Sequence, residues 1–463
     1  MQPPHKIHFI GICGVAMSAV AIALARKGYA VTGSDSGFFP PVSTNLTNLG
    51  IPYYPGFHPE KMIEGGAPDL VIVGNAIGSK NPELLYVKEH GIPFKSYPEA
   101  VGEFLIKPKS IVVAGTYGKT TMSALLSHIL RETGFKPSYM TGGVTQDGSL
   151  SAEIGAGDWS VVEGDEYMSA KWDQRAKFVH YRPTHLLLSA VKWDHADVYP
   201  EEELYFEAFR KLIAASPFIV ACSDTEKLPA LLAEAGREYV SYGKSASAAY
   251  RYKNVNESRD GIAFDVVAKD GTFRIQSQLL GGYNAENVTG CFAMAKEIGA
   301  APEAVAHAIA SFKGMKRRLE KRLVGPVTVI DDIAHSPEKA RSVLATLRSA
   351  YSGSIIAVYE PNSGNRTPQS KPDYASAFKD ADMVVIPRLT KLKVDESNLE
   401  KTFDGPELRD TIAATQTNAV YMESDEALVD LLAKDRKEGD VVVFLGSHGF
   451  RGMIEATIER LPA

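Results

Sequence analysis

Short apolar runs alternate with longer amphipathic segments from one end of the chain to the other. In the first hundred residues, residues 7–10, 30–32 and 70–73 form apolar, β-rich runs, and residues 15–27 form a helical segment. Buried parallel strands read as continuous apolar runs, whereas the crossover helices between them repeat with a longer period. The pattern predicts a parallel sheet covered by helices, and therefore an α/β fold.

The same alternation continues twice more. A polar stretch at 245–270 predicts a β-rich excursion, and residues 285–312 predict a helix. The further buried strands predicted from apolar runs are 110–114, 159–162, 186–189, 218–221, 327–330, 355–358, 383–386 and 441–445. Three successive blocks of strands and helices therefore follow one another along the chain.

The length supports this division. A chain of 463 residues favours about three domains of ordinary size. We place them at 1–107, 108–322 and 323–463. Linkers rich in proline or of low complexity are absent from the sequence, so the joints between the domains are expected to be short.

Composition narrows the class of protein. The net charge of −6 argues against a nucleic-acid or anionic membrane surface. Three widely spaced cysteines, Cys13, Cys222 and Cys291, indicate buried thiols in a reducing compartment. The apolar stretch from Ile7 to Ala25 has the outline of a signal peptide, but its two glycines and the strand that follows favour a folded βαβ unit. We expect a cytoplasmic protein without a membrane span.

A glycine-rich loop after the strand 110–114 carries the sharpest chemical signal. Its residues are Gly115, Thr116, Tyr117, Gly118, Lys119, Thr120 and Thr121. Strand, glycine turn and helix form the context in which backbone N–H groups bind phosphate oxygens. Lys119 supplies a mobile cation for the β- and γ-phosphates, and Thr120 offers a hydroxyl to Mg²⁺. The sequence predicts an ATP site, although the loop lacks the first glycine of the common Walker form.

Carboxylates follow the next predicted strand. Glu163, Asp165 and Glu166 stand at the end of an apolar run, where carboxylates need a cation or solvent. Mg²⁺ normally takes one or two carboxylates together with phosphate oxygens, and Glu163 is our predicted ligand. The alternative is a solvated acidic loop. Further along, Asp194-His195-Ala196-Asp197 offers a histidine between aspartates, which is a weaker signal for a metal site.

Several weaker motifs have structural alternatives. Asn284 and Asn287 open a predicted helix and are equally consistent with helix caps. Arg318 lies in a basic run that suits phosphoryl charge but is also consistent with a solvated face. Asp332 follows a predicted strand, where ligands enter open α/β sheets, and the alternative is again a helix cap.

The first block contains an incomplete dinucleotide fingerprint. Gly11 and Gly14 stand in the turn after the first strand, and Asp35 follows Gly14 by 21 residues. An acidic residue at this spacing meets ribose in Rossmann folds. The turn does not match G-x-G-x-x-G, so it indicates a nucleotide without indicating a nicotinamide.

Taken in order, these motifs resemble the Mur ligases, the cytoplasmic amide-forming enzymes of bacterial cell-wall precursor assembly. The resemblance covers essentially the whole chain, and it implies an N-terminal Rossmann-like UDP-sugar domain, a central P-loop ATPase domain and a C-terminal Rossmann-like domain. The motifs are Gly33-Ser34-Asp35, Gly-Thr-x-Gly-Lys-Thr-Thr, Glu-x-Asp-Glu, Asp-His, Asn-x-x-Asn, Arg-Arg-x-Glu and Asp-Asp-x-Ala-His-x-Pro. An ordered set of this kind is far more specific than any single member.

The resemblance also implies roles for individual residues. Those implied in ATP binding are Gly115, Thr116, Gly118, Lys119, Thr120, Thr121, Asn287 at adenine, Arg318 at the γ-phosphate and Asp332 at ribose. Those implied as catalytic are Lys119, His195 and Arg318, and those implied as Mg²⁺ ligands are Thr120, Glu163 and His195. Those implied in binding the UDP-sugar are Gly11, Cys13, Gly14, Ser34, Asp35 and Asn75.

The implied reaction joins the carboxylate of UDP-N-acetylmuramate to an amine through an acyl phosphate, with ATP converted to ADP. The segments 11–14, 40–44, 74–76 and 177–181 are similar to members that attach L-alanyl-γ-D-glutamyl-meso-diaminopimelate in peptidoglycan recycling. The alternative amine is free L-alanine. The partners expected are these small molecules, with no nucleic acid and no membrane, and the sequence says nothing of the oligomeric state.

Some positions depart from the family pattern. Tyr117 and Tyr283 stand where histidine is common, Gly164 replaces alanine, and Asn362 falls where arginine is common in the tripeptide-using members. Arg210 occupies the place at which some members carry a carbamylated lysine, so we expect none here. Two other classes compete: a non-catalytic nucleotide-binding relative, and a nicotinamide-dependent oxidoreductase. The oxidoreductase would leave Lys119, Glu163 and Arg318 without a role.

Overall fold

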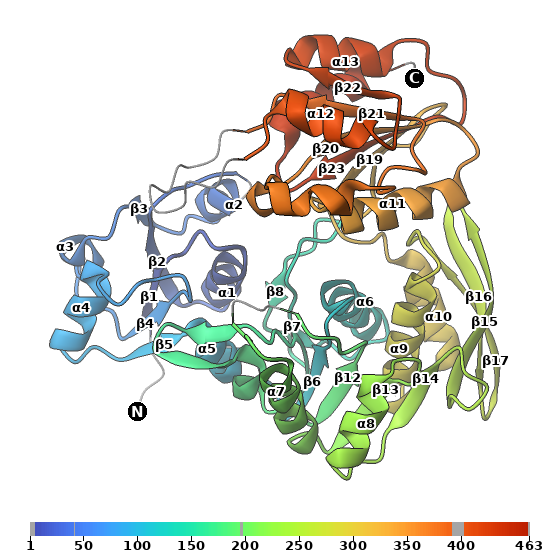
Figure 1. Cartoon of the computed structure of the whole chain (residues 1–463). Helices are drawn as coiled ribbons and strands as arrows, with labels where there is room; N and C mark the ends of the chain where they lie inside the picture. The colour runs from blue at the N-terminus through green and yellow to red at the C-terminus, as the bar shows by residue number, and fades with distance from the viewer. Residues whose placement is uncertain (1–4, 41, 195–197, 391–401, 462–463) are drawn as a thin grey trace. The chain divides into compact units, whose positions relative to one another are not determined.

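The structure is a computed structural model, and it describes residues 5–40, 42–194, 198–390 and 402–461 (Figure 1). The chain divides into two compact units. Unit 1 contains residues 1–254, 264–276 and 285–312. Unit 2 contains residues 255–263, 277–284 and 313–463.

The first sheet lies in unit 1. Its strand order is β3-β2-β1-β4-β5 and every pairing is parallel. The elements are β1 (Lys6–Ile10), α1 (Val15–Arg26), β2 (Ala30–Asp35), α2 (Val42–Asn48), β3 (Tyr53–Pro55), α3 (Pro59–Met62), β4 (Leu70–Val73), α4 (Pro82–Glu89), β5 (Phe94–Ser96) and α5 (Tyr97–Phe104). Alternate residues of β4 pack toward opposite faces, Ile72 with α1 and α5, Val73 with α3 and α4. Helices on both faces explain why these strands are apolar throughout.

The second sheet has the order β17-β16-β15-β14-β13-β12-β6-β9-β7-β8. Its central strands are parallel, and their residues are buried except at one end of each strand. The elements are β6 (Lys109–Ala114), α6 (Lys119–Glu132), β7 (Ser138–Met140), β8 (Ala152–Glu153), β9 (Trp159–Glu163), the 3₁₀ helix η1 (Lys177–Tyr181), β12 (His185–Leu188), α7 (Glu202–Ala214), β13 (Phe218–Cys222), α8 (Lys227–Glu234), β14 (Val240–Gly243), β15 (Tyr250–Ser258), β16 (Gly261–Ala268) and β17 (Gly271–Ser277). A short hairpin, β10 (Met168–Ala170) with β11 (Asp173–Ala176), stands apart from this sheet. The β-rich excursion predicted at 245–270 is confirmed and extends to Ser277.

The helical stretch predicted at 285–312 is confirmed, and it is divided into two helices. Residues 285–312 form two helices, α9 (Asn284–Glu297) and α10 (Pro302–Ser311). Gly299 adopts a φ of +98° and Pro302 stands in the first turn of α10. A left-handed glycine ends a helix and a proline in the first turn begins one, so the break has a local cause.

The third sheet lies in unit 2 in the order β18-β19-β23-β20-β21-β22. Only β18 pairs antiparallel among the pairings of this sheet. The elements are β18 (Glu320–Leu323), β19 (Thr328–Asp332), α11 (Pro337–Ala350), β20 (Ile355–Glu360), η2 (Ser363–Asn365), η3 (Pro368–Tyr374), β21 (Met383–Pro387), α12 (Gly405–Ala413), β22 (Ala419–Met422), α13 (Asp425–Ala433), β23 (Val441–Gly446), η4 (Phe450–Gly452) and α14 (Met453–Arg460). Helices α11 and α12 cover one face, and α13 and α14 cover the other. The predicted α/β class is therefore confirmed, while the exact boundaries 107/108 and 322/323 stay predictions.

Candidate active site

The phosphate loop joins β6 to α6, as predicted. Gly115 has a φ of +127° and Gly118 a φ of +81°, which is left-handed backbone that favours glycine. A Cβ at Gly115 would lie 2.2 Å from the Ser189 hydroxyl oxygen, and one at Gly118 would lie 2.5 Å from Oδ1 of Asn287. Both glycines are required by conformation and by space. Asn287, on α9, is thereby brought to the loop although 169 residues separate it from Gly118.

Lys119 begins α6 and folds back over the loop. Its ammonium group donates to the Gly115 carbonyl at 2.7 Å and lies 2.9 Å and 3.0 Å from the two carboxylate oxygens of Glu166. The Glu166 side chain is fully buried. A buried carboxylate is costly without a cation, so this ion pair explains how Glu166 is tolerated inside the protein. Glu166 has no individual role predicted from sequence, although its place after an apolar strand was a signal for one.

Glu163 ends β9 beside the start of α6. Its Oε1 accepts the Thr120 hydroxyl at 2.9 Å, and its Oε2 accepts the Gly142 N–H at 2.7 Å. Burial raises the pKa of Glu163 and outweighs these two hydrogen bonds and the nearby Lys119. A carboxylate and a hydroxyl oxygen at this spacing suit Mg²⁺, and a cation would offset the desolvation of the carboxylate. The donor set at the loop therefore fits the predicted ion.

The third carboxylate of this motif has its own cation. Asp165 lies 2.5 Å from the Lys177 ammonium group, which belongs to η1. Burial alone would raise the pKa of Asp165, but the Lys177 charge and hydrogen bonds from Lys177 and the Tyr167 N–H lower it overall. Phe178 and Tyr181 anchor η1 in the core of unit 1. The segment 177–181, selected from sequence for its similarity to tripeptide-using ligases, thus supports the carboxylate motif.

The two remaining loop threonines differ. Thr116 donates from its hydroxyl to the Lys192 carbonyl at 2.7 Å, and the same oxygen accepts the Lys192 N–H at 2.8 Å. This side chain fixes the loop to the segment after β12. Thr121 is half-buried in the first turn of α6. The Tyr117 side chain between them is 56% exposed, and its carbonyl accepts the Ser189 hydroxyl at 2.5 Å.

The predicted metal ligand His195 lies outside the described residues, as does Asp197. Trp193, just before them, donates its indole N–H to the Tyr199 carbonyl at 3.0 Å. Arg210, at the place of the carbamylated lysine, instead forms ion pairs with Glu203, Glu207 and Glu234. The role of His195 stays a prediction.

In unit 2, Asp332 ends β19 and Arg318 precedes β18. The Asp332 carboxylate accepts the Leu319 N–H at 2.7 Å and the Ala334 N–H at 2.8 Å, and burial raises its pKa. Arg318 is exposed. Tyr283, 53% exposed, lies in the electrostatic field of both residues. Asp332 therefore organises the turn that carries Arg318, in addition to any contact with ribose.

Arg317 is the first arginine of the Arg-Arg-x-Glu motif, and no separate role was predicted for it. Its guanidinium donates to the carbonyls of Gly446 at 2.5 Å, Ser447 at 3.0 Å and His448 at 3.0 Å. It also lies 3.4 Å from the buried Asp331 carboxylate. Arg317 has a φ of +57°, so the backbone turns sharply here. The contacts fix the loop after β23 within unit 2 and direct Arg317 inward.

The first sheet gathers the residues predicted to bind the UDP-sugar. The Asp35 carboxylate accepts the Cys13 N–H at 2.8 Å, and Gly11, with a φ of +88°, donates to the Ser34 carbonyl at 2.8 Å. Gly14 caps α1, and Asn75 follows β4 and is half-buried. These residues lie at the carboxyl edge of the sheet, where ligands enter an open α/β fold.

Ser34 differs from its neighbours. Its side chain is fully buried, and its hydroxyl donates to Glu83 on α4. Glu83 also accepts the Tyr54 hydroxyl at 2.6 Å and the His58 N–H at 2.8 Å. The buried Ser34 side chain stabilises the end of β2 through Glu83. A ligand contact by this residue therefore stays a prediction. No motif in the sequence indicated this role of Glu83.

Comparison with protein families matches the chain in three consecutive parts. Residues 6–107 match the "Mur ligase family, catalytic domain", residues 113–295 match the "Mur ligase middle domain", and residues 315–448 match the "Mur ligase, glutamate ligase domain". These three matched domains, with the phosphate loop in the second, identify an ATP-dependent, ADP-forming ligase. The chain belongs to the Mur ligase family.

Curated relatives extend over nearly the whole chain. The UDP-N-acetylmuramate–L-alanyl-γ-D-glutamyl-meso-2,6-diaminoheptandioate ligase of Escherichia coli is 31% identical over 465 residues, 98% of each chain. The UDP-N-acetylmuramate–L-alanine ligase of Anaeromyxobacter is 32% identical over 388 residues, 83% of this chain and 82% of its own. The two kinds of relative are thus similar in identity to this chain.

Solved structures divide in the same way. The UDP-N-acetylmuramate–alanine ligase of Thermotoga maritima matches with a TM-score of 0.79 at 25% identity over 98% of each chain. The murein peptide ligase of Psychrobacter arcticus matches with a TM-score of 0.67 at 26% identity over 98% of each chain. Both matches confirm the fold. Among the described residues, no helix combines the length and apolar character needed to cross a membrane.

Proposed function

We propose that the protein joins the carboxylate of UDP-N-acetylmuramate to the amine of L-alanyl-γ-D-glutamyl-meso-diaminopimelate in peptidoglycan recycling. The observation that carries this proposal is the end-to-end similarity to the Escherichia coli ligase of that name, which spans 98% of both chains. The role of segment 177–181 beside Asp165 supports it as well. We place the reaction in the cytoplasm, where its small-molecule substrates are found.

The phosphate loop supports the use of ATP in this reaction. Lys119 is held at the loop by the Gly115 carbonyl and by Glu166, so its charge is already in place for a nucleotide. Backbone N–H groups at the start of α6 add positive potential for phosphate oxygens. We assign the contact with the base to Asn287, which lies against Gly118 of the loop. We assign the γ-phosphate contact to Arg318 and the ribose contact to Asp332.

We assign Mg²⁺ to Thr120 and Glu163, with His195 as the further predicted ligand. The Thr120 hydroxyl and the buried Glu163 carboxylate lie 2.9 Å apart. When bound, the ion would neutralise phosphate charge and so reduce its repulsion of the incoming carboxylate. Because burial disfavours the charged form of Glu163, a nearby cation would stabilise this carboxylate.

The proposed chemistry has two steps. A substrate carboxylate oxygen attacks the γ-phosphorus of ATP, the bond to the bridging oxygen breaks, and ADP leaves with the acyl phosphate formed. The amine then attacks the activated carbonyl, and inorganic phosphate leaves from the tetrahedral intermediate as the amine loses its proton. Lys119 stabilises the charge that develops on the phosphoryl oxygens. The reaction gives one amide, one ADP and one phosphate.

A second function is favoured by specific observations. The Anaeromyxobacter relative, which is named for L-alanine, is 32% identical, and the Thermotoga maritima structure has the higher TM-score of the two described above. Asn362, which falls where tripeptide-using members commonly carry arginine, accepts the Asn365 amide through its own side-chain oxygen at 2.5 Å. UDP-N-acetylmuramate–L-alanine ligation is therefore the alternative activity.

A phosphate-release assay distinguishes these functions. The purified protein is given ATP, Mg²⁺ and UDP-N-acetylmuramate with either L-alanine or the diaminopimelate tripeptide, and kcat/KM is measured for each amine. We expect the tripeptide to be preferred at least about tenfold, because a larger substrate offers more binding energy to the transition state.

The other outcomes have definite meanings. Preference for L-alanine would assign the alternative reaction. ATP binding without amine-dependent phosphate release would contradict both ligase reactions and favour a non-catalytic nucleotide-binding relative. Mass spectrometry of the UDP-linked product identifies the amide that is formed.

A further inference from the structure

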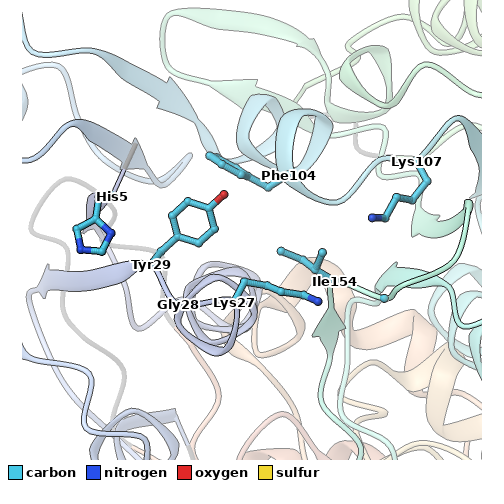
Figure 2. Close-up of a pocket in the computed structure, with 8 residues that line it drawn as sticks. His5, Lys27, Gly28, Tyr29, Phe104, Lys107 and Ile154 are labelled. Atoms are coloured by element: carbon cyan, nitrogen blue, oxygen red, sulfur yellow. The ribbon is translucent and has the colours of Figure 1, made fainter. Parts of the chain in front are cut away.

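Unit 1 contains a cavity of about 460 Å³ that the ligase reaction does not use (Figure 2). It is lined by His5, Lys27, Gly28, Tyr29, Phe104, Lys107, Ile154 and Gly155. The volume lies within the range of ordinary small-molecule sites. Its lining comes from four separate stretches of the chain, so the fold is needed to assemble it.

The charged side chains of the lining are all basic. Lys27 and Lys107 direct their ammonium groups toward the same space (Figure 2), and the lining includes no Asp or Glu. Neither lysine forms an ion pair within the described ranges of the chain. The Asp69 carboxylate, beside the lining residue His5, accepts the backbone N–H groups of His5 and Lys6 at 2.9 Å and 2.8 Å. In a protein of net charge −6, two such cations around one cavity favour an anion.

The remaining walls are apolar with one hydroxyl. The Tyr29 and Phe104 rings meet edge to face, with 5.7 Å between their centroids. Ile154 lies on another side of the cavity, and the Tyr29 hydroxyl points into it (Figure 2). Gly155 is required beside Ile154, since a Cβ there would lie 2.1 Å from the Pro137 carbonyl oxygen. An occupant therefore needs an apolar body in addition to its charge.

The position of the cavity separates it from the reaction. Lys107 precedes β6, and Lys27–Tyr29 precede β2, so the cavity lies at the amino ends of these strands. The phosphate loop follows the carboxyl end of β6. The six residues of β6 span roughly 20 Å at the rise of an extended strand. A molecule in the cavity is thus distinct from the nucleotide at the loop.

We propose that this cavity is a second ligand site, for a small organic dianion with an apolar body. Lys27 and Lys107 bind the negative oxygens, the Tyr29 hydroxyl donates to one of them, and Phe104 and Ile154 pack against the body. Two sources share this chemistry: a phosphate monoester and a dicarboxylate. The inference concerns only binding and does not depend on which amine the ligase uses.

Isothermal titration calorimetry with phenyl phosphate and with phthalate tests the proposal. The full-length protein carries Lys119→Ala, so that the phosphate loop does not contribute to the heat. We expect one saturable site per chain, and the tighter probe identifies the source of the dianion. Binding weakens with added salt because the contact is charged. In the variant that also carries Lys27→Gln and Lys107→Gln, we expect affinity to fall at least about tenfold.

Two controls make the result decisive. Lys379→Gln removes an exposed lysine charge in unit 2 and leaves the affinity unchanged. The single change Lys27→Gln affects an exposed side chain and provides a variant that keeps its fold if the double change does not. Absence of saturable binding by both probes, or equal affinity with and without the two cavity lysines, would overturn the proposal.

Discussion

At the scale of single residues, each buried carboxylate near the phosphate loop has an assigned partner. Glu166 pairs with Lys119, Asp165 with Lys177, and Glu163 with the Thr120 hydroxyl. Removing one member of such a pair leaves a buried charge without compensation, which destabilises a protein more than the pair stabilised it. Substitutions here therefore affect folding and catalysis together, and the two effects need separate measurement.

Lys119→Ala tests the loop. The change removes the cation that we assign to the β- and γ-phosphates, and we expect kcat to fall by about three orders of magnitude or more. Phosphate release measures the rate, and thermal melting measures the stability of the same sample. Lys379→Ala is the matched control for loss of an exposed lysine elsewhere. Turnover near that of the unchanged enzyme would remove the loop from the mechanism.

Asp331 predicts a pH dependence of stability. It is 2% exposed, and burial raises its pKa to about 6 despite Arg317 and Arg322 nearby. The folded state therefore holds this proton at pH values where the unfolded state has lost it. The free energy of unfolding should fall as the pH rises from about 4 to about 6, by up to about 3 kcal/mol.

Asp331→Asn carries no titrating group and should not show that fall, so the variant is the more stable protein at pH 7. Urea unfolding at several pH values gives the difference between the two curves. The raised pKa of Asp331 would be contradicted if the difference in free energy of unfolding between the two proteins stayed constant from pH 4 to pH 7. It would also be contradicted if the unchanged protein became the more stable of the two as the pH rises.

At the scale of elements, the strand, glycine turn and helix of the phosphate loop were predictable because all three signals are local. Apolar runs predicted the central strands for the same reason. Contacts between distant segments were not predictable: Ser34 donates to Glu83, 49 residues away, and Asn287 packs on Gly118. Local sequence does not show which buried hydroxyl will donate to which carboxylate. A role for Glu83 could therefore not be predicted before the fold was known.

The packing of α9 on the loop gives a prediction of its own. Gly118→Ala adds a Cβ 2.5 Å from Oδ1 of Asn287 in left-handed backbone. We expect the KM for ATP to rise at least about tenfold, because Asn287 must move away from the loop. Gly134→Ala is the matched control: its φ of +85° carries the same backbone penalty, and nothing lies within 4 Å of its Cβ. Equal effects of the two changes would mean that strain alone is responsible.

At the scale of the whole molecule, the two units are interleaved in sequence. Residues 255–263 and 277–284 belong to unit 2 although they lie between segments of unit 1. Leu280 belongs to the core that α11 covers, and the Ser349 hydroxyl donates to Glu257 at 3.0 Å. A single boundary position along the chain cannot describe units that each contain several segments. Apolar periodicity follows the order of the sequence, so it predicted one joint near residue 322.

Leu280→Ala tests this interleaving. The side chain is 3% exposed, and its loss should destabilise unit 2 by about 2–4 kcal/mol. Hydrogen exchange followed by mass spectrometry should show faster exchange in β19, β20 and β23, with β6 and β12 unchanged. Leu126→Ala, a fully buried leucine of unit 1, should give the opposite distribution. Faster exchange in β6 rather than β19 after Leu280→Ala would contradict the division.

The Lys119–Glu166 pair has a consequence for how nucleotides come and go. Because the ammonium group already has an anionic partner, an arriving phosphate competes with a carboxylate instead of filling an empty place. The net affinity for a nucleotide then equals what Lys119 gains from the phosphate minus what it loses from the Glu166 carboxylate. A nucleotide with fewer phosphoryl groups therefore competes less well for the lysine. We therefore expect Glu166 to assist the release of ADP, because its carboxylate can pair with Lys119 again as the nucleotide leaves. A lysine that is paired in this way would bind the product nucleotide less tightly than an unpaired lysine in the same loop.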